Sequence, residues 1–345
     1  MEKVTLTTIA RNLNISLAVV SRVINGKGPQ YRISRETQQK ILEEASRVGY
    51  KVDNITQAMR KKSQLSVALI LPSVSNNYFS DIASYVIREG QKQGCTVTML
   101  DCEESETRQQ EILQTLVKHN ELDGIIIAPC GFNIDFLEQI DQRFAPVVLI
   151  DRYYGNSKLP YITSNNYNGA IEGTNLLISQ GHKRIVCIQG DEDSVPNMKR
   201  VAGFVKAMSV SGYDAKVVGN DFSMENGYTE TKLLLQNKES SPTAIFCLSN
   251  TICLGAIKAI RETSLRIPED ISVICFDDNF YLDYITPKIT RVGQQSEEMG
   301  RLAMKVMIER IRNKESGILP QLQLSTSLII RDSVRKVSLL GQEML

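Results

Sequence analysis

From Leu65 onward, short apolar runs alternate with stretches that have the periodicity of amphipathic helices. This alternation is the βαβ pattern of α/β proteins, in which helices cover parallel sheets. The runs are numerous enough for two sheets, and a helix is predicted over residues 295–314. The predicted strands cover residues 65–72, 95–101, 123–128, 146–151, 184–190, 215–220, 244–249, 272–277, 290–293 and 322–330.

The composition excludes several classes of protein. None of the apolar runs approaches the roughly 20 residues that a membrane-spanning helix needs. The first residues enter a polar, amphipathic segment without the apolar centre of a signal peptide, so we expect a cytoplasmic protein. The chain has seven cysteines but no close C-x-x-C pair, which predicts reduced thiols and no zinc site.

The charges are distributed unevenly along the chain. Residues 1–63 hold twelve Lys or Arg and five Asp or Glu, whereas the remainder holds 28 basic and 34 acidic residues. A basic segment on an acidic body favours a polyanionic partner for that segment alone. The alternative is a solvated pair of N-terminal helices without a partner.

The first 50 residues predict three short helices. Leu6, Ile9, Ala10 and Leu13 have the spacing of one helical face, and Thr5 precedes them as an N-cap. A turn of about three residues leads to a second helix, capped by Ser16 and ended by Gly26 and Gly28. A third helix follows Ser34. Two helices joined by so short a turn form a helix-turn-helix, whose second helix can enter the major groove of DNA.

The order of these features resembles the DNA-binding head of the LacI/GalR family of bacterial repressors. The resemblance rests on Val4-Thr5-Leu6-x-x-Ile9-Ala10, Ile15-Ser16, Val20-Ser21-Arg22-Val23-Ile24-Asn25-Gly26, Ser34-x-x-Thr37 and Gly49-Tyr50. Each piece is weak alone, but together and in this order they are specific. The resemblance implies a homodimeric, effector-controlled repressor that binds a near-palindromic operator.

The family pattern assigns DNA-contacting roles to particular residues. Leu17, Ala18 and Arg22 would read bases: Arg22 can bind guanine through two hydrogen bonds, and the other two offer apolar contact. Phosphate contacts are implied for Thr5, Ser16, Ser21 and Asn25. In the hinge the family motif is replaced by Val52, Asp53, Thr56 and Met59. Met59 is either a wedge in the minor groove or a linker residue.

The resemblance continues through the rest of the chain. It implies a core of two lobes, similar to periplasmic sugar-binding proteins, with an effector cleft between the lobes. Arg200 and Asp277 would bind polar groups of the effector, and aromatic rings would stack on it. Phe79 also fits a core position, and Asp151 also fits a helix cap. The implied effector-binding residues are Tyr78, Phe79, Asp151, Arg200, Phe222, Ser249, Asn250 and Asp277.

These features predict a domain organisation. We expect a helix-turn-helix head over residues 1–50, a hinge over 51–64 and a core over 65–345. The first lobe would take about 65–162 and 291–321, and the second about 163–290 and 322–333.

The remaining motifs favour binding over catalysis. The chain has neither a P-loop nor a G-x-G-x-x-G after a strand, and it has no nucleophile elbow. We therefore expect no catalytic residues, no metal and no cofactor, and a structural role for His182. A sugar or sugar derivative is the first candidate effector, and a nucleobase or nucleoside the second. The rival function is a small-molecule-binding protein or an enzyme on the same α/β core.

Overall fold

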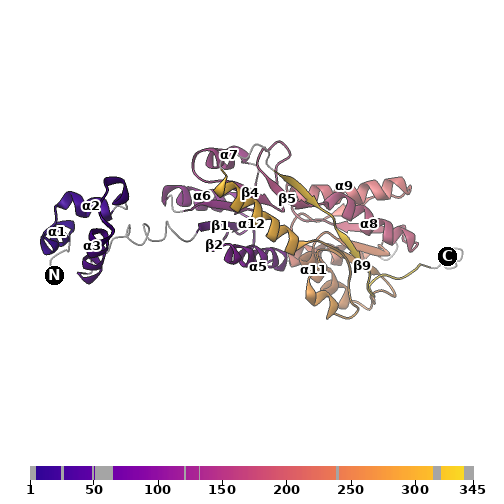
Figure 1. The fold of residues 1–345 in the computed structure, drawn as a ribbon. Helices are drawn as coiled ribbons and strands as arrows, with labels where there is room; N and C mark the ends of the chain where they lie inside the picture. The colour runs from indigo at the N-terminus through magenta and orange to yellow at the C-terminus, as the bar shows by residue number, and fades with distance from the viewer. Residues whose placement is uncertain are drawn as a thin grey trace, which may run out of the picture. The chain divides into compact units, whose positions relative to one another are not determined.

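The computed structural model describes residues 5–24, 27–48, 50, 65–119, 122–131, 133–237, 241–313 and 320–337. The chain divides into two compact units, Met1–Leu65 and Ser66–Leu345, which we call the head and the core (Figure 1).

The head contains α1 (Leu6–Leu13), α2 (Leu17–Ile24), the 3-10 turn η1 (Pro29–Tyr31) and α3 (Arg35–Arg47). Local signals set these bounds. Asn14 ends α1 in the left-handed conformation, with a φ of 53°. The Ser16 hydroxyl then accepts a hydrogen bond from the Val19 N–H at 3.3 Å and begins α2. The Ser34 hydroxyl accepts the Thr37 N–H at 3.2 Å and begins α3.

The three helices of the head enclose a small hydrophobic core of their own. Each helix contributes the apolar face that its spacing predicts, so the head buries its own hydrophobic side chains. The buried members of this core are Ile9, Ala10, Val20, Val23, Ile24, Ile41 and Ala45.

The core contains two six-stranded sheets. The first has the order β11 (Gln321–Leu324), β5 (Tyr161–Ser164), β4 (Val147–Ile150), β3 (Gly124–Ile127), β1 (Leu65–Leu71) and β2 (Cys95–Asp101). The second has the order β12 (Ser327–Ile329), β10 (Thr290–Gly293), β9 (Ser272–Phe276), β8 (Ala244–Cys247), β6 (Ile185–Ile188) and β7 (Lys216–Val218).

Helices cover both sheets and define two lobes (Figure 1). The first lobe carries α5 (Asn77–Lys92), α6 (Glu106–His119), α7 (Ile134–Arg143) and α12 (Ser296–Arg312). The second carries α8 (Asn166–Ser179), α9 (Val195–Val210), α10 (Met224–Gln236), α11 (Asn250–Arg261) and η2 (Phe280–Asp283).

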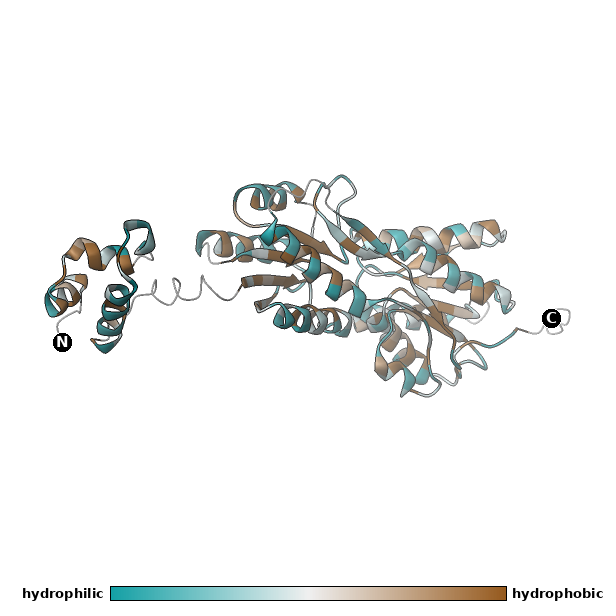
Figure 2. Cartoon of the chain, viewed as in Figure 1, coloured by the Kyte–Doolittle hydropathy of each residue, from teal (hydrophilic) through white to brown (hydrophobic). Residues whose placement is uncertain are grey.

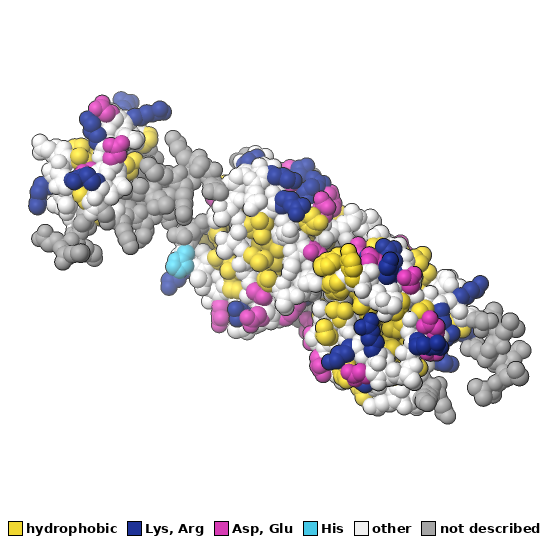
Figure 3. Space-filling model, turned by 90° about the horizontal axis from the view of Figure 1, so that it is seen from below, with side chains coloured by type: hydrophobic (Ala, Val, Ile, Leu, Met, Phe, Trp, Pro, Cys, Tyr) yellow, Lys and Arg dark blue, Asp and Glu magenta, His cyan; other side chains and the backbone are white. Residues whose placement is uncertain are grey.

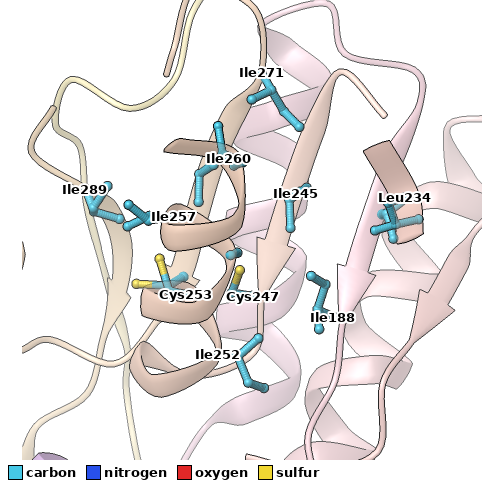
Figure 4. Close-up of a cluster of buried hydrophobic side chains, with 14 of the residues drawn as sticks. Ile188, Leu234, Ile245, Cys247, Ile252, Cys253, Ile257, Ile260, Ile271 and Ile289 are labelled. Atoms are coloured by element: carbon cyan, nitrogen blue, oxygen red, sulfur yellow. The ribbon is translucent and has the colours of Figure 1, made fainter. Parts of the chain in front are cut away.

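The central strands are buried on both faces and are apolar along their length (Figure 2). In the second lobe, Ile188 and Ile245 of the sheet pack against Ile252, Ile257 and Ile260 of α11 (Figure 4). Burial of each such side chain stabilises the fold by about 1.5–3 kcal/mol. The predicted α/β class and two-sheet core are thus confirmed.

The structure corrects three details of the predicted core. β5 was not expected from the sequence. The run 322–330 forms two strands, β11 in the first sheet and β12 in the second. β12 pairs with β10 in antiparallel fashion, so the second sheet is not entirely parallel.

The chain crosses between the lobes after β5, after β10 and after β11. All three crossings lie a few residues later than the boundaries near 162, 291 and 322 suggested by the sequence, since β5 continues to Ser164 in the first sheet. β10 continues to Gly293 in the second sheet, and β11 continues to Leu324 in the first. Within the part of the chain that the structure describes, no helix is long and apolar enough to cross a membrane.

Candidate functional site

A small cavity lies between the two lobes, where loops after the strands of both sheets meet. This is the place where open α/β sheets bind ligands. Its lining includes seven of the eight residues predicted to bind an effector: Tyr78, Phe79, Asp151, Arg200, Phe222, Ser249 and Asp277. The other lining residues, which the prediction did not include, are Asn76, Glu104, Arg152, Ser194 and Pro196.

Asn250 is the predicted residue that is not part of this lining. It is fully buried at the start of α11, where its backbone N–H donates to Asp277 Oδ2 at 3.2 Å. Its side-chain amide donates to Asn279 Oδ1. Asn250 therefore uses its N–H groups to bind Asp277 and Asn279 in the neighbouring loop, and it does not itself line the cavity.

Two aspartates face the cavity from equivalent places in the two lobes. Asp151 directly follows β4, and Asp277 directly follows β9. Both have left-handed backbones, with φ values of 61° and 81°. Residues other than glycine rarely adopt this backbone conformation, and those that do are often found at functional sites. The backbone thus places one carboxyl group at the end of each central strand.

A chain of polar groups within hydrogen-bonding distance connects these two carboxyl groups across the lobes. The Tyr78 hydroxyl on α5 lies 2.8 Å from Asp151 Oδ1 and 3.1 Å from Gln294 Oε1. Gln294 Nε2 donates to Asp277 Oδ1 at 2.6 Å. Met299 Sδ lies 3.6 Å from the same hydroxyl. Because a hydroxyl has one hydrogen, Tyr78 can donate to only one of its two oxygen acceptors at a time. Burial raises the pKa of Asp151 and of Tyr78.

Arg200 on α9 is almost completely buried and is held on three sides. Its Nε donates to Asn166 Oδ1 and its Nη1 to the Leu248 carbonyl oxygen, both at 2.7 Å. The guanidinium lies over the Phe276 ring, 3.9 Å from the centroid, and 3.9 Å from Asp277 Oδ1. Among the described residues none accepts a hydrogen bond from Nη2, so this donor has no protein partner there.

Two further residues of the cavity lining, Ser194 and Phe222, have unusual surroundings. The Ser194 hydroxyl is buried and has no hydrogen-bond partner among the described residues. Phe222 packs directly over Gly190, where an added Cβ would lie 2.3 Å from the ring. Only glycine at that position lets the ring occupy its place in the lining.

An ion pair that the sequence did not reveal forms another part of the lining. Arg152 Nη1 and Nη2 bind the two Glu104 oxygens at 2.7 and 2.9 Å. Glu104 follows β2 and Arg152 follows β4, so the pair is 48 positions apart in the sequence. No spacing rule could have found it, although each residue follows a predicted strand end.

In the head, the three predicted base readers lie on the outer face of α2. Leu17, Ala18 and Arg22 are exposed, whereas Val20 and Val23 on the opposite face are buried. The Arg22 guanidinium lies over the ring of Tyr31, with Cζ 4.0 Å from the centroid.

The predicted phosphate contacts are placed less uniformly. Thr5 and Ser16 are exposed immediately before α1 and α2, and Ser21 is half-buried on α2. Asn25 and the predicted wedge Met59 lie outside the described residues, as do the other hinge positions Val52, Asp53 and Thr56.

The residues that the structure describes include no group of three or more His, Cys, Asp or Glu side chains suited to a metal ion. His182 lies away from the cavity lining. Its Nδ1 is 3.0 Å from the Thr243 hydroxyl, and its Nε2 is 3.2 Å from the Arg335 carbonyl oxygen. It therefore ties the last part of the chain to the second lobe.

Comparison with known proteins agrees with this geometry. Residues 174–334 match the model of the periplasmic binding protein-like domain. Catabolite control protein A of Priestia megaterium is 26% identical over 336 residues, which cover 96% of this chain and 99% of that protein. The ribose operon repressor of Haemophilus influenzae is 28% identical over 336 residues, covering 96% and 98%.

Among solved structures, a putative ribose operon repressor from Burkholderia thailandensis superposes with a TM-score of 0.68 at 26% identity. The match covers 76% of this chain and 98% of that one. A two-lobed binding core that follows a helix-turn-helix head defines a class of transcription regulators with an effector-binding domain. Within that class, the chain is similar over nearly its whole length to repressors of the LacI/GalR type.

Proposed function

We propose that this protein is a cytoplasmic repressor that binds a near-palindromic operator as a homodimer and responds to a small polar effector in the cleft. The chain of polar groups from Asp151 through Tyr78 and Gln294 to Asp277 carries this proposal. Because of this chain, the contacts between the two lobes depend on polar groups at the cavity. A molecule that binds there favours one arrangement of the lobes, and such coupling is typically worth about 1–3 kcal/mol.

The cavity chemistry favours an effector with hydroxyl groups. Tyr78 has one hydrogen for two acceptors, so a ligand hydroxyl would supply the missing donor. The Nη2 atom of Arg200 and the unpartnered Ser194 hydroxyl would bind ligand oxygens. Phe79 and Phe222 offer aromatic surface to the apolar face of a ring. A sugar or sugar derivative satisfies all three, and relatives that repress ribose operons support this class.

A nucleobase or nucleoside is the second candidate effector. Its ring would stack on the same aromatic side chains, and its edge would pair with Arg200 and Asp277. It would make less use of the Tyr78 hydroxyl and its two acceptors, which is why we place it second.

Exposed apolar side chains on one face of the core support dimerisation. Phe280 and Tyr284 at the η2 turn are 75% and 84% exposed, and their rings meet edge to face. In the first lobe, a groove along α5 includes Ala83, Ile87 and the exposed Met99. Figure 3 shows hydrophobic side chains gathered over both lobes on the face that contains α5 and α11. Apolar patches of this kind mark interaction sites.

The cavity lining argues against the rival enzymatic function. It contains no histidine, cysteine or lysine, and its carboxyl groups already contact protein partners: Glu104 contacts Arg152, Asp151 contacts Tyr78, and Asp277 contacts Gln294. Ser249 is the N-cap of α11: its hydroxyl accepts the Ile252 N–H at 3.2 Å and lies 2.9 Å from the Thr251 hydroxyl. We therefore propose that the cleft binds its ligand without converting it.

Two experiments test the proposal. The full chain is used to select binding sequences from a pool of random DNA duplexes, and its thermal stability is screened against sugars and nucleobases. We expect a near-palindromic consensus, a rise in melting temperature with one chemical class, and a change in operator affinity with that ligand. Selection of no consensus would refute the DNA-binding function. A stabilising ligand that never changes operator affinity would refute the effector role.

A further inference from the structure

The contact between Arg22 and Tyr31 joins the predicted base-reading helix to the turn that follows it. Arg22 is in the last turn of α2, and Tyr31 is the last residue of η1. The guanidinium carbon lies 4.0 Å from the centre of the Tyr31 ring, which is cation–π stacking distance. Tyr31 remains 51% exposed, so burial in the head does not by itself account for a tyrosine at this position.

The turn that carries Tyr31 is tied to the body of the head. The Tyr31 N–H donates to the Gly28 carbonyl oxygen at 3.3 Å, and the Ile33 N–H donates to the same oxygen at 3.1 Å. The Gln38 side chain on α3 donates to the Ile33 carbonyl oxygen at 2.6 Å. Ile33 itself packs against the hydrophobic core of the head. The ring is therefore presented by a braced backbone.

Stacking leaves the hydrogen-bonding edge of the guanidinium available. A separation of 4.0 Å allows parallel stacking, in which the ring covers the flat face of the Arg22 guanidinium and the N–H donors point outward in its plane. A guanine in the major groove is bound through these in-plane donors. An unsupported arginine would lose more side-chain freedom when it binds the base, so a ring that already restricts it lowers that cost.

We propose that Tyr31 is a positioning residue that holds Arg22 in place to read a guanine and so contributes to sequence specificity. This inference rests on the proposed DNA-binding function. It names a residue outside the helix-turn-helix motif and assigns a role to its ring face.

The test uses the operator selected by the wild-type full chain, and the same operator with one base pair changed in each half-site. The changed pair is the one whose identity stops mattering in Arg22→Ala. We expect Tyr31→Ala to weaken operator binding by about 5- to 30-fold for a protein that uses two heads. Affinity for the changed operator should stay nearly the same. The specificity ratio, which is the affinity for the selected operator divided by that for the changed one, therefore falls.

Three comparisons isolate the ring face as the cause. Tyr31→Phe keeps the ring and should retain the wild-type ratio. Tyr31→Leu keeps apolar bulk without a ring and should resemble Tyr31→Ala. Gln30→Ala changes an exposed neighbour on the same turn and should have no effect on the ratio. In an Arg22→Ala background, Tyr31→Ala should cause no additional loss.

Each contrary outcome is distinct. An unchanged specificity ratio in Tyr31→Ala overturns the inference. If Tyr31→Phe loses as much operator affinity as Tyr31→Ala, the inference also fails, because that result would point to a contact between the hydroxyl and a phosphate. Wild-type affinity in Tyr31→Leu would show that apolar packing is sufficient without a ring, and this result would also overturn the inference. An equal loss with and without Arg22 would show that the two residues act separately. If the wild type shows no sequence preference, the proposed function itself fails.

Discussion

Asn279 in the second lobe donates a hydrogen bond from Nδ2 to Asp81 Oδ2 on α5 of the first lobe, at 3.3 Å. Asn279 also binds Asn250 behind the cavity wall. This bond links the lobes beside the cleft, and it can form only while the lobes are this close. It therefore connects the loop cluster around Asp277 directly to the opposite lobe.

Removal of this bond should weaken effector binding. Asp81→Ala deletes the acceptor of the bond from Asn279 but leaves the cavity lining intact. Because the site is partly exposed, we expect a loss of about 0.5–1.5 kcal/mol, or roughly 2- to 10-fold in the effector dissociation constant. Calorimetric titration with the effector found in the screen measures this. Asp135→Ala, an exposed change on α7, serves as control. Equal affinity in wild type and Asp81→Ala would contradict the role of the bond.

Operator binding should depend steeply on salt. The twelve basic residues among the first 63 predict several phosphate contacts for each head. Two heads imply a slope of roughly −5 to −10 in a plot of log affinity against log salt concentration. Fluorescence anisotropy between low and physiological salt measures the slope. A slope close to zero would argue against DNA binding through the basic head.

The protein should be a dimer that depends on the η2 surface. Asp283 in this turn binds Arg291 Nη2 at 2.9 Å and Arg331 Nε at 2.7 Å, which fixes the turn. These hydrogen bonds, from Arg291 first, hold the pKa of Asp283 well below its usual range. In a symmetric dimer each change counts twice, so Phe280→Ser with Tyr284→Ser should raise the dimer dissociation constant at least about 100-fold.

Analytical ultracentrifugation at several concentrations measures this equilibrium. Phe144→Ser is a matched control, because Phe144 is another exposed aromatic residue, 50% exposed, at the end of α7. A wild-type chain that is monomeric or tetrameric would refute the predicted dimer. A doubly substituted chain that stays dimeric would place the interface elsewhere.

Effector response should depend on Arg200 and Asp277, while operator binding without effector should not. Arg200→Ala removes the donor Nη2, and Asp277→Asn removes a charge while suiting the left-handed backbone. Lost polar contacts in a closed pocket cost about 1–3 kcal/mol each, so the effector dissociation constant should rise roughly 10-fold to more than 100-fold.

Operator titrations with and without effector measure this response, and they also show whether the effector induces or corepresses. Arg312→Ala, an exposed change on α12, is the control, and thermal melting verifies that each variant folds. Wild-type effector sensitivity in both folded variants would exclude these residues from the effector site.

His182 should make stability depend on pH. Burial lowers the pKa of His182 to about 4 in the folded chain, against a reference value of 6.5. The unfolded chain thus binds the proton first as pH falls. This contribution to stability is fully present above pH 6.5 and is lost as the pH falls from 6.5 toward 4. Between pH 7 and 5.5 the loss is on the order of 1 kcal/mol.

Urea denaturation of wild type and His182→Gln at these two pH values isolates the effect. The substituted chain should be less stable at pH 7 but should lose less stability on acidification. His119→Gln, at the exposed end of α6, is the control. The same pH dependence in wild type and His182→Gln would contradict the prediction.

The sequence predicted most of the fold because parallel strands buried on both faces are continuous apolar runs. β5, with the sequence Tyr-Ile-Thr-Ser, lacks such a run and was missed. β11 and β12 each lie at a sheet edge and are only partly buried, so nothing in 322–330 marked the passage from one sheet to the other.

The site was predictable where a residue ends a strand or belongs to a family motif, as Asp151 and Arg200 do. Gln294, Glu104 and Tyr31 were not found, because their importance comes from contacts that the fold creates. Gln294 meets Tyr78 across 216 positions of sequence. Local spacing carries no information about such pairs.

The edge positions of β11 and β12 also bear on how the protein is made. Neither sheet is complete until the ribosome has added these last strands, whereas the residues of the head's hydrophobic core all lie within the first 50. The head can thus fold early in synthesis, long before the core, since N-terminal domains generally fold first. A message cut short before codon 320 would encode a whole head attached to two unfinished sheets. Such a fragment would keep the face of α2 that we propose to read DNA and would lack the complete cleft that we propose to bind the effector.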